Sequence, residues 1–278
     1  GAEEKVVCRL QNTTSDGAAT AFEFLDRTSI IYKGQNAIDG GRFAFEFVVP
    51  KDISYNDGEG RIVLFANSGD GQRQINGVSG GVEFNGTGNL PLDSIGPSVF
   101  CYLNTPSFAN GDKVNATPYF MAEIYDESGI NATGTGIGHD MTLVIDGSPA
   151  MTYNLNDSFS FDYGSYQSGK VGFAIPTLAT GSHKLMFRSW DVLNNPSVAE
   201  LSFVVDDKLA PGVYDIAATD NPVRSTTTFI VSHDRAGMPL DVETEIFDLS
   251  GRKVASAKTN ETAQCNTTLV RWDPCSVG

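Results

Sequence analysis

The feature that most limits the fold of this chain is an alternation of apolar and polar residues with a period of two. It is plainest at Phe43, Phe45, Phe47 and Val49, which place three rings and a valine on one face of an extended segment. The same alternation returns over residues 120–124, 143–145, 185–187 and 201–205 and around Ile246. No segment of ten or more residues has a convincing helical period. We therefore expect an all-β protein.

Turn-forming residues separate these runs and divide the chain. They occur at 56–60 (NDGEG), 68–71 (SGDG), 146–147 (DG) and 249–251 (LSG). Stronger breaks lie at 91–97, which holds Pro91 and Pro97, and at 206–211, which ends in Pro211. We expect three tandem immunoglobulin-like β-sandwich domains, over residues 1–96, 97–207 and 208–278.

The two ends suggest a piece of a longer protein. The chain begins with Gly-Ala-Glu-Glu and enters a strand-like run almost at once, so we expect that it was excised from a larger chain. The third domain is short for a sandwich, and its last strand pattern spans 268–272. We expect the natural sequence to continue beyond Gly278 with at least one more strand. No window approaches 18 consecutive apolar residues, so no membrane span is expected.

The net charge of the chain limits which kinds of partner it can bind. With 34 acidic and 19 basic side chains, the formal net charge is −15. Such a surface repels phosphate backbones and anionic membranes, so we expect no nucleic acid as a partner.

The cysteines and histidines do not form a recognisable catalytic or zinc motif. Cys8 and Cys101 lie in apolar runs and are expected to be buried and inert, whereas a disulfide between Cys265 and Cys275 remains open. The three histidines, which we assign to turns or strand ends, are His139, His183 and His233. The sequence has no HExxH and no paired CxxC. We predict no catalytic residue and no cofactor in this chain.

Two stretches are dense in Gly, Asn, Asp and aromatic residues, namely 126–140 (DESGINATGTGIGHD) and 187–197 (FRSWDVLNNPS). Oxygen-rich loops suit a hard cation. Calcium candidates in the first stretch are Asp126, Glu127, Asn131 and Asp140. A second group, Asp52, Asn56, Asp57 and Glu59, lacks EF-hand spacing, and a tight turn is the preferred interpretation there.

Hydrolysis or binding of glycans is the remaining class of function that the sequence leaves open. Paired carboxylates could serve a glycosidase, but the sequence gives no reason to choose any pair among the 34 acids. Trp190 and Trp272 are the candidates for a sugar-stacking platform, although Trp190 lies in a strand pattern and is expected to pack in a core. A surface glycan-binding β-sandwich protein is therefore the alternative function, and a free-standing enzyme is a further one.

Several long blocks in order resemble a known family. They include GGRFAFEFVVPKDISYNDGEGRIVLFA, TPYFMAEIYDESGINATGTGIGHDMTLVIDG, SGKVGFAIPTLATGSHKLMFRSWDVLNNPS and DNPVRSTTTFIVSHDR. From about Phe22 to Arg252 the chain resembles the C-terminal region of PorU-type proteins, sortase-like cysteine peptidases of the gingipain family found with type IX secretion systems of Bacteroidetes. In that family the catalytic Cys and His lie upstream of the region matched here.

The resemblance carries expectations about location and partners. It implies export through the periplasm to the cell surface at the outer membrane. It also implies two partners, an outer-membrane β-barrel protein (PorV-like) and an upstream catalytic domain of the same chain. The third domain resembles FlgD-like or sorting-type domains, in DNPV, VETEIFDLSGRKV and RWD, but it stops before their usual closing hairpin and strand. The fragment is thus expected to be a non-catalytic scaffold and docking region.

Overall fold

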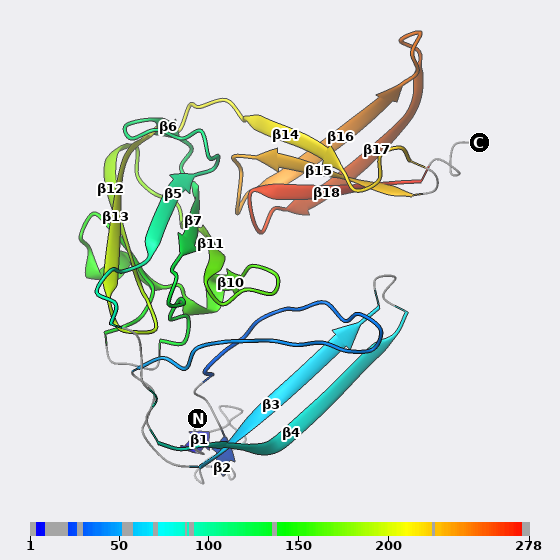
Figure 1. Cartoon of the computed structure of the whole chain (residues 1–278). Helices are drawn as coiled ribbons and strands as arrows, with labels where there is room; N and C mark the ends of the chain where they lie inside the picture. Colours follow the sequence, from blue (N-terminus) through cyan, green and yellow to red (C-terminus); the bar gives the residue numbers. More distant parts are fainter. Residues whose placement is uncertain are drawn as a thin grey trace, which may run out of the picture.

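The fold is all-β, as predicted, with short 3-10 turns as its only helical elements among the described residues (Figure 1). The computed structural model describes residues 4–8, 22–26, 30–51, 58–68, 72–86, 88, 92–134, 138–223 and 226–273. In this part of the chain no helix is long or apolar enough to span a bilayer.

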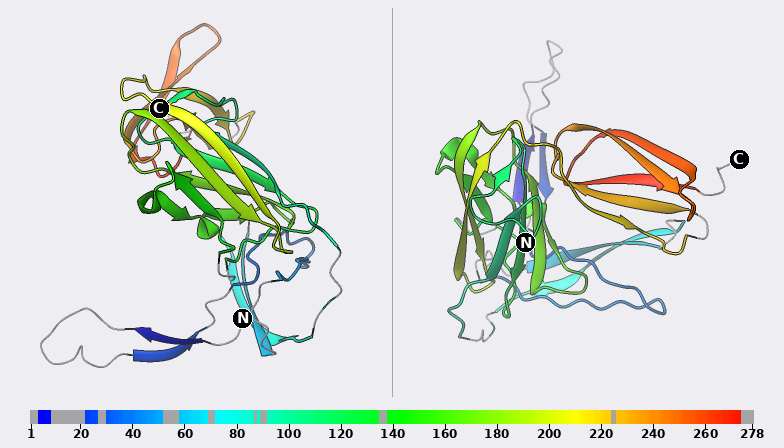
Figure 2. Two further views of the ribbon diagram at one scale, coloured as in Figure 1. Left: turned by 90° about the vertical axis from the view of Figure 1, so that its left-hand side faces the viewer. Right: turned by 90° about the horizontal axis from the view of Figure 1, so that it is seen from above.

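Residues 98–205 form a sandwich of two sheets (Figures 1 and 2). One sheet has the order β10-β11-β7-β5, from Phe159–Phe161, Ser168–Ala174, Tyr119–Tyr125 and Ser98–Leu103. The other has the order β6-β13-β12-β8-β9, from Lys113–Val114, Pro196–Val205, Gly181–Trp190, Thr142–Ile145 and Thr152–Asn154. β6 pairs with β13 in parallel, and the other pairs are antiparallel.

The alternating residues of this sandwich face inward and form its core. Phe120, Ala122 and Ile124 of β7 are at most 2% exposed, and Phe120 meets Phe187 of β12 at a ring-centroid distance of 5.2 Å. Leu143 and Ile145 of β8 are fully buried in the same cluster. Each of the buried Phe, Leu and Ile side chains contributes about 1.5–3 kcal/mol by leaving water. The predicted Asp-Gly turn is also present, because Asp146 and Gly147 both have positive φ, at 53° and 64°.

The first region is built differently, from two hairpins. β1 (Glu4–Cys8) pairs with β2 (Phe22–Asp26), and β3 (Gly58–Asn67) pairs with β4 (Gln74–Phe84). Between them, the rings of Phe43, Phe45 and Phe47 stack at 6.2–6.3 Å, so the predicted shared face is confirmed. Within the described residues, however, this segment is extended without strand pairing apart from the bridge of Asp39 with Arg42.

The third region contains a three-stranded sheet and a hairpin. β14 (Val213–Ala218), β15 (Thr227–His233) and β18 (Thr267–Trp272) form the sheet in the order β14-β15-β18. β16 (Pro239–Phe247) and β17 (Lys253–Thr262) form the hairpin. The predicted last strand at 268–272 is thus present as β18.

Polar contacts fix the start of the third region and also join this region to the sandwich. The Nη2 of Arg235 donates to the carbonyl of Leu209 at 2.6 Å, and its Nη1 lies 3.0 Å from the buried Asp234 carboxylate. Asn266 donates to the carbonyl of Asn104 at 3.2 Å. Each sheet takes its strands from within one of the ranges 1–96, 97–207 and 208–278, while the domain boundaries themselves remain a prediction.

Candidate functional site

The two dense stretches of sequence meet at one end of the sandwich. Asp126 follows β7 and Asp191 follows β12, and a β-bridge joins Ile130 to Asp191. The backbone N–H of Val192 donates to the carbonyl of Gly129 at 2.9 Å. Gly129 is required there because its φ is 114° and a Cβ would lie 2.9 Å from the Tyr166 ring. The loops are therefore fixed against each other by backbone contacts.

Three carboxylates gather where these loops meet. Asp93, Asp126 and Asp191 each place an oxygen within 4.8 Å of the others, and Asp126 and Asp191 are only 5% and 0% exposed. Asp126 accepts hydrogen bonds from the backbone N–H groups of Ser128 and Gly129, at 2.8 and 3.0 Å. The cluster thus closes the loop that follows β7.

The other two carboxylates also accept hydrogen bonds from neighbouring groups. Asp191 accepts from the backbone of Leu193 at 2.9 Å and of Asn195 at 2.6 Å, and also from the Asn195 side chain at 2.6 Å. Asp93 accepts from the hydroxyl of Ser128 at 2.6 Å. This last bond joins the segment before β5 to the loop after β7.

The three groups differ in proton affinity. Burial, together with the charges of Asp191 and Asp93, raises the pKa of Asp126 to about 6, although the hydrogen bonds from the backbone of Ser128 and Gly129 lower it. Burial also raises the pKa of Asp191, whereas the hydrogen bond from Ser128 lowers the pKa of Asp93. Asp93 is therefore the member that holds its charge most readily. Asp126 is the one that takes up a proton or needs a neighbouring cation.

The predicted calcium residues are only partly brought together. Asp126 belongs to the cluster, but Glu127 and Asp140 do not. Asn131 uses its side-chain oxygen for Thr133, at 3.2 Å to the backbone N–H and 2.9 Å to the hydroxyl. Asp93 and Asp191 were missed, although both stand in stretches that the sequence marked, LPLDSIGPSV and FRSWDVLNNPS.

Calcium binding stays a prediction. Three carboxylate oxygens suit a hard cation. A calcium titration that leaves the melting temperature unchanged would remove the idea. In the second candidate group, Asp52, Asn56 and Asp57 lie outside the described residues, and Glu59 is exposed.

The histidines serve the fold. His183 lies 2.7 Å from the Asp146 carboxylate and 2.8 Å from the carbonyl of Ala179. His233 is buried beside the hydroxyl of Thr268, at 3.1 Å, and burial lowers its pKa. The His139 ring packs on Trp190 at a centroid distance of 4.4 Å.

The two thiols that the structure describes have different surroundings. Cys101 packs against the core, and burial raises its pKa to about 12. Cys265 is free, with its sulfur 3.1 Å from the Thr267 hydroxyl. Its suggested disulfide partner, Cys275, lies outside the described residues, and so do the side-chain surroundings of Cys8.

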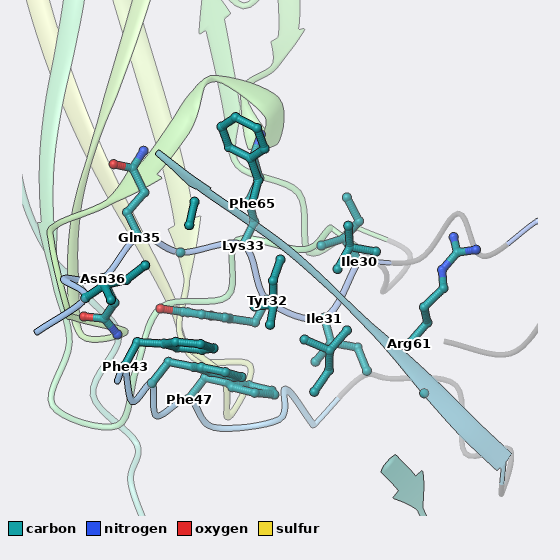
Figure 3. Close-up of a pocket in the computed structure, with 18 of the residues that line it drawn as sticks. Ile30, Ile31, Tyr32, Lys33, Gln35, Asn36, Phe43, Phe47, Arg61 and Phe65 are labelled. Carbon is teal, nitrogen blue, oxygen red and sulfur yellow. The ribbon is translucent and has the colours of Figure 1, made fainter. Parts of the chain in front are cut away.

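A second feature is an apolar groove of about 590 Å³ in the first region (Figure 3). One wall is the stack of Phe43, Phe45 and Phe47, continued by Tyr32, and the other is β3 from Arg61 to Ala66. Figure 3 shows the Phe43 and Phe47 rings lying one over the other beside Tyr32. The groove offers mainly apolar surface and ring edges, and Lys33 and Arg61 are charged residues of its lining.

Tyr32 also connects this groove to the sandwich. Its hydroxyl donates to the carbonyl of Ser165 at 3.3 Å, and its ring lies 5.2 Å from that of Phe161. The backbone N–H of Gly164 donates to the carbonyl of Gln35 at 2.9 Å. The first region is thus held to the sandwich near the turn after β10.

One of three comparisons with known proteins agrees with the resemblance. A search of family models finds no match, and a search of curated proteins finds none either. Among solved structures, the chain is similar to a protein described as dimeric latent PorU from Porphyromonas gingivalis, with 34% sequence identity and a TM-score of 0.48. The match covers 98% of this chain and 25% of the other, so the chain spans about a quarter of that protein's length.

Proposed function

We propose that the chain is a non-catalytic scaffold and docking region of a cell-surface, PorU-type cysteine peptidase that acts as a sortase in type IX secretion. The observation that carries this proposal is the sequence identity of 34%, which extends over 98% of the chain while corresponding to a quarter of PorU. Such coverage is expected when a chain corresponds to one part of a larger protein.

The state of the thiols and imidazoles supports the non-catalytic part of the proposal. A cysteine peptidase needs a thiolate within hydrogen-bond reach of an imidazole. Cys101 is held in its neutral form, and both ring nitrogens of His183 are already engaged. The purified chain should therefore have no peptidase activity above that of a Cys101→Ser control.

The three regions are proposed to divide the work. The third region, 208–278, contacts an outer-membrane β-barrel partner of the PorV type, and the first two regions support the upstream catalytic domain. Sheets with unpaired edges can accept a strand from a partner. Among the described residues of the third region, β14 and β18 are the edge strands of their sheet, so each has one edge without a strand partner there.

Deletion of residues 208–278 from the intact surface protein tests the docking role. The barrel partner should then fail to co-purify, whereas a Cys101→Ser variant should retain it in full. Trp190 fluorescence of the deleted protein would establish that the sandwich still folds. Co-purification at full yield after the deletion would refute the assignment of docking to this region.

A surface glycan-binding function is the alternative. Sugar stacking needs exposed ring faces. Trp190 is partly buried against His139, Trp272 lies 6.2 Å from the Phe229 ring, and the rings of the groove cover one another's faces. These contacts favour the scaffold. A polysaccharide screen that finds binding, lost on Trp or Tyr substitution, would reverse the preference.

A further inference from the structure

The linker between the sandwich and the third region, residues 206–212, is held at both ends (Figure 1). At its start, the Asp206 carboxylate accepts from the Nζ of Lys113, in the sandwich, at 3.0 Å. At its end, the backbone N–H of Gly212 donates to the buried Asp234 carboxylate, in the third region, at 2.9 Å. The linker is therefore part of a joint between the two regions.

Residues next to His233 make two further contacts of this joint. Arg235, which is 9% exposed, donates from Nη2 to the carbonyl of Leu209 in the linker at 2.6 Å. The side chain of Asn266 donates to the carbonyl of Asn104 in the sandwich at 3.2 Å. The backbone N–H of His233 in turn donates to the carbonyl of Asn266 at 2.9 Å. His233 therefore adjoins both of the groups that reach the linker and the sandwich.

The hydrogen bonds of the His233 ring require its neutral form. The backbone nitrogen of Arg235 lies 3.1 Å from Nδ1, and since this N–H can only donate, Nδ1 carries no proton. Nε2 then carries the proton and donates to the Thr268 hydroxyl at 3.1 Å. A second proton, on Nδ1, would turn this acceptor into a donor and break the bond to Arg235.

The surroundings of the ring favour this neutral form. Burial is the main cause that lowers the pKa of His233 from its ordinary value of 6.5. The charges of Asp234 and, from β17, Glu261 act against burial, whereas the charge of Arg235 acts with it. Tyr214 of β14 interacts with Asp234 and Arg235, and burial raises the pKa of its phenol, so this group stays neutral in acid. The ring of His233 is thus neutral at neutral pH.

We propose that His233 is a proton-sensitive latch of the joint between the sandwich and the third region. At neutral pH the segment 233–235 holds the linker and, through Asn266, the sandwich. In acidic solution Nδ1 takes up a proton, the bond to Arg235 breaks, and the third region is released to move relative to the sandwich. The inference goes beyond the proposed function, because it concerns the joint itself, whatever the third region binds.

The pH range follows from the direction of the pKa shift. The pKa of His233 is lowered in the closed joint and returns towards 6.5 when the ring is hydrated, so the open joint binds the proton more tightly. The contribution of His233 to the closed joint is therefore complete above about pH 6.5 and is lost as the pH falls through the lowered pKa.

Hydrogen exchange of the whole chain, measured by mass spectrometry at about pH 7.5 and about pH 4.5 and corrected for the intrinsic effect of pH, tests the proposal. Peptides that cover residues 207–213 and 233–236 should become at least about tenfold less protected in acid, while β7 and β12 of the sandwich stay protected. Nuclear magnetic resonance of isotope-labelled histidine gives the tautomer and the pKa of each ring. The pH at which half of the protection is lost should equal the pKa of His233.

His233→Asn is the variant that isolates the proton, because the Asn side-chain oxygen can accept from Arg235 in place of Nδ1 and takes up no proton. In this variant the joint should stay closed at both pH values. The same substitution at His183, a histidine on β12 of the sandwich, is the matched control and should leave the acid response of the joint unchanged.

The unmodified chain decides the matter by itself if His233→Asn fails to fold. Equal protection of the joint at both pH values would overturn the proposal, and so would a midpoint that differs from the pKa of His233. An acid response that persists in His233→Asn would assign the effect to another group, such as the Asp234 carboxylate, and would also overturn it. Equal loss of protection in the sandwich would indicate acid unfolding of the whole chain, which contradicts a local latch.

Discussion

The sandwich and the first region carry the same sequence pattern but different amounts of buried surface. Phe120, on β7 of the sandwich, is fully buried, whereas Phe43 and Phe45 in the first region are 46% and 39% exposed. Both segments alternate with a period of two. Alternation therefore defines one face of a strand, but that face is buried only where a second layer of structure packs on it.

The largest difference between the two regions is expected in the loss of stability when a phenylalanine ring is removed. Phe120→Ala removes a buried ring and leaves a cavity, so it should lower the free energy of unfolding of the sandwich by about 3–5 kcal/mol. Phe45→Ala should cost less than about 1 kcal/mol in the isolated chain. Trp190 fluorescence during denaturant unfolding, in a Trp272→Phe background, measures both. Similar losses for the two variants would contradict the comparison.

The carboxylate cluster should make the stability of the sandwich depend on pH. The pKa of Asp126 in the folded chain, about 6, is above its ordinary value of 3.8, so folding favours the protonated form. Its contribution to stability is complete below about pH 4 and is lost as the pH rises through about 6. Asp126→Asn should therefore stabilise the sandwich by about 1–2 kcal/mol at pH 7, with little gain at pH 4.

Asp157→Asn is the matched control, since Asp157 is exposed in the same sandwich. It should leave the unfolding free energy nearly unchanged at both pH values. The difference between wild type and each variant, measured at pH 4 and pH 7, isolates the single group. A loss of stability in Asp126→Asn at pH 7 would indicate that the charged form is held by a cation.

The smallest effect is expected at the contact between the two regions. Tyr32→Ala removes the hydrogen bond to Ser165 and the ring contact with Phe161, so it should change the stability of the sandwich by no more than about 1 kcal/mol. Proteolytic cleavage within residues 30–49 should nevertheless become several-fold faster. Tyr163→Ala, at a ring that is 66% exposed, is the control and should not change the cleavage rate.

The fold was largely predictable because strand formation depends on neighbours in sequence. Alternation placed Phe120, Ala122 and Ile124 on one buried face, and Asp146-Gly147 forms the expected turn. The segment 43–49 shows the limit of this reasoning. Its rings share a face as predicted, but its backbone has no strand partner among the described residues. Strand pairing depends on residues far away in the sequence, so the local pattern does not predict it.

The all-β class, the turns and the sides on which side chains lie could be read from the amino-acid sequence, because they follow from backbone geometry over a few residues. The meeting of Asp126 with Asp93 and Asp191, rather than with Glu127 and Asp140, became visible in the folded chain alone. That meeting depends on how β7 and β12, strands of opposite sheets, end beside each other. Asp93 and Asp191 are 33 and 65 positions from Asp126 in the sequence. Contacts over such separations depend on how whole layers pack, and no local sequence pattern encodes that packing.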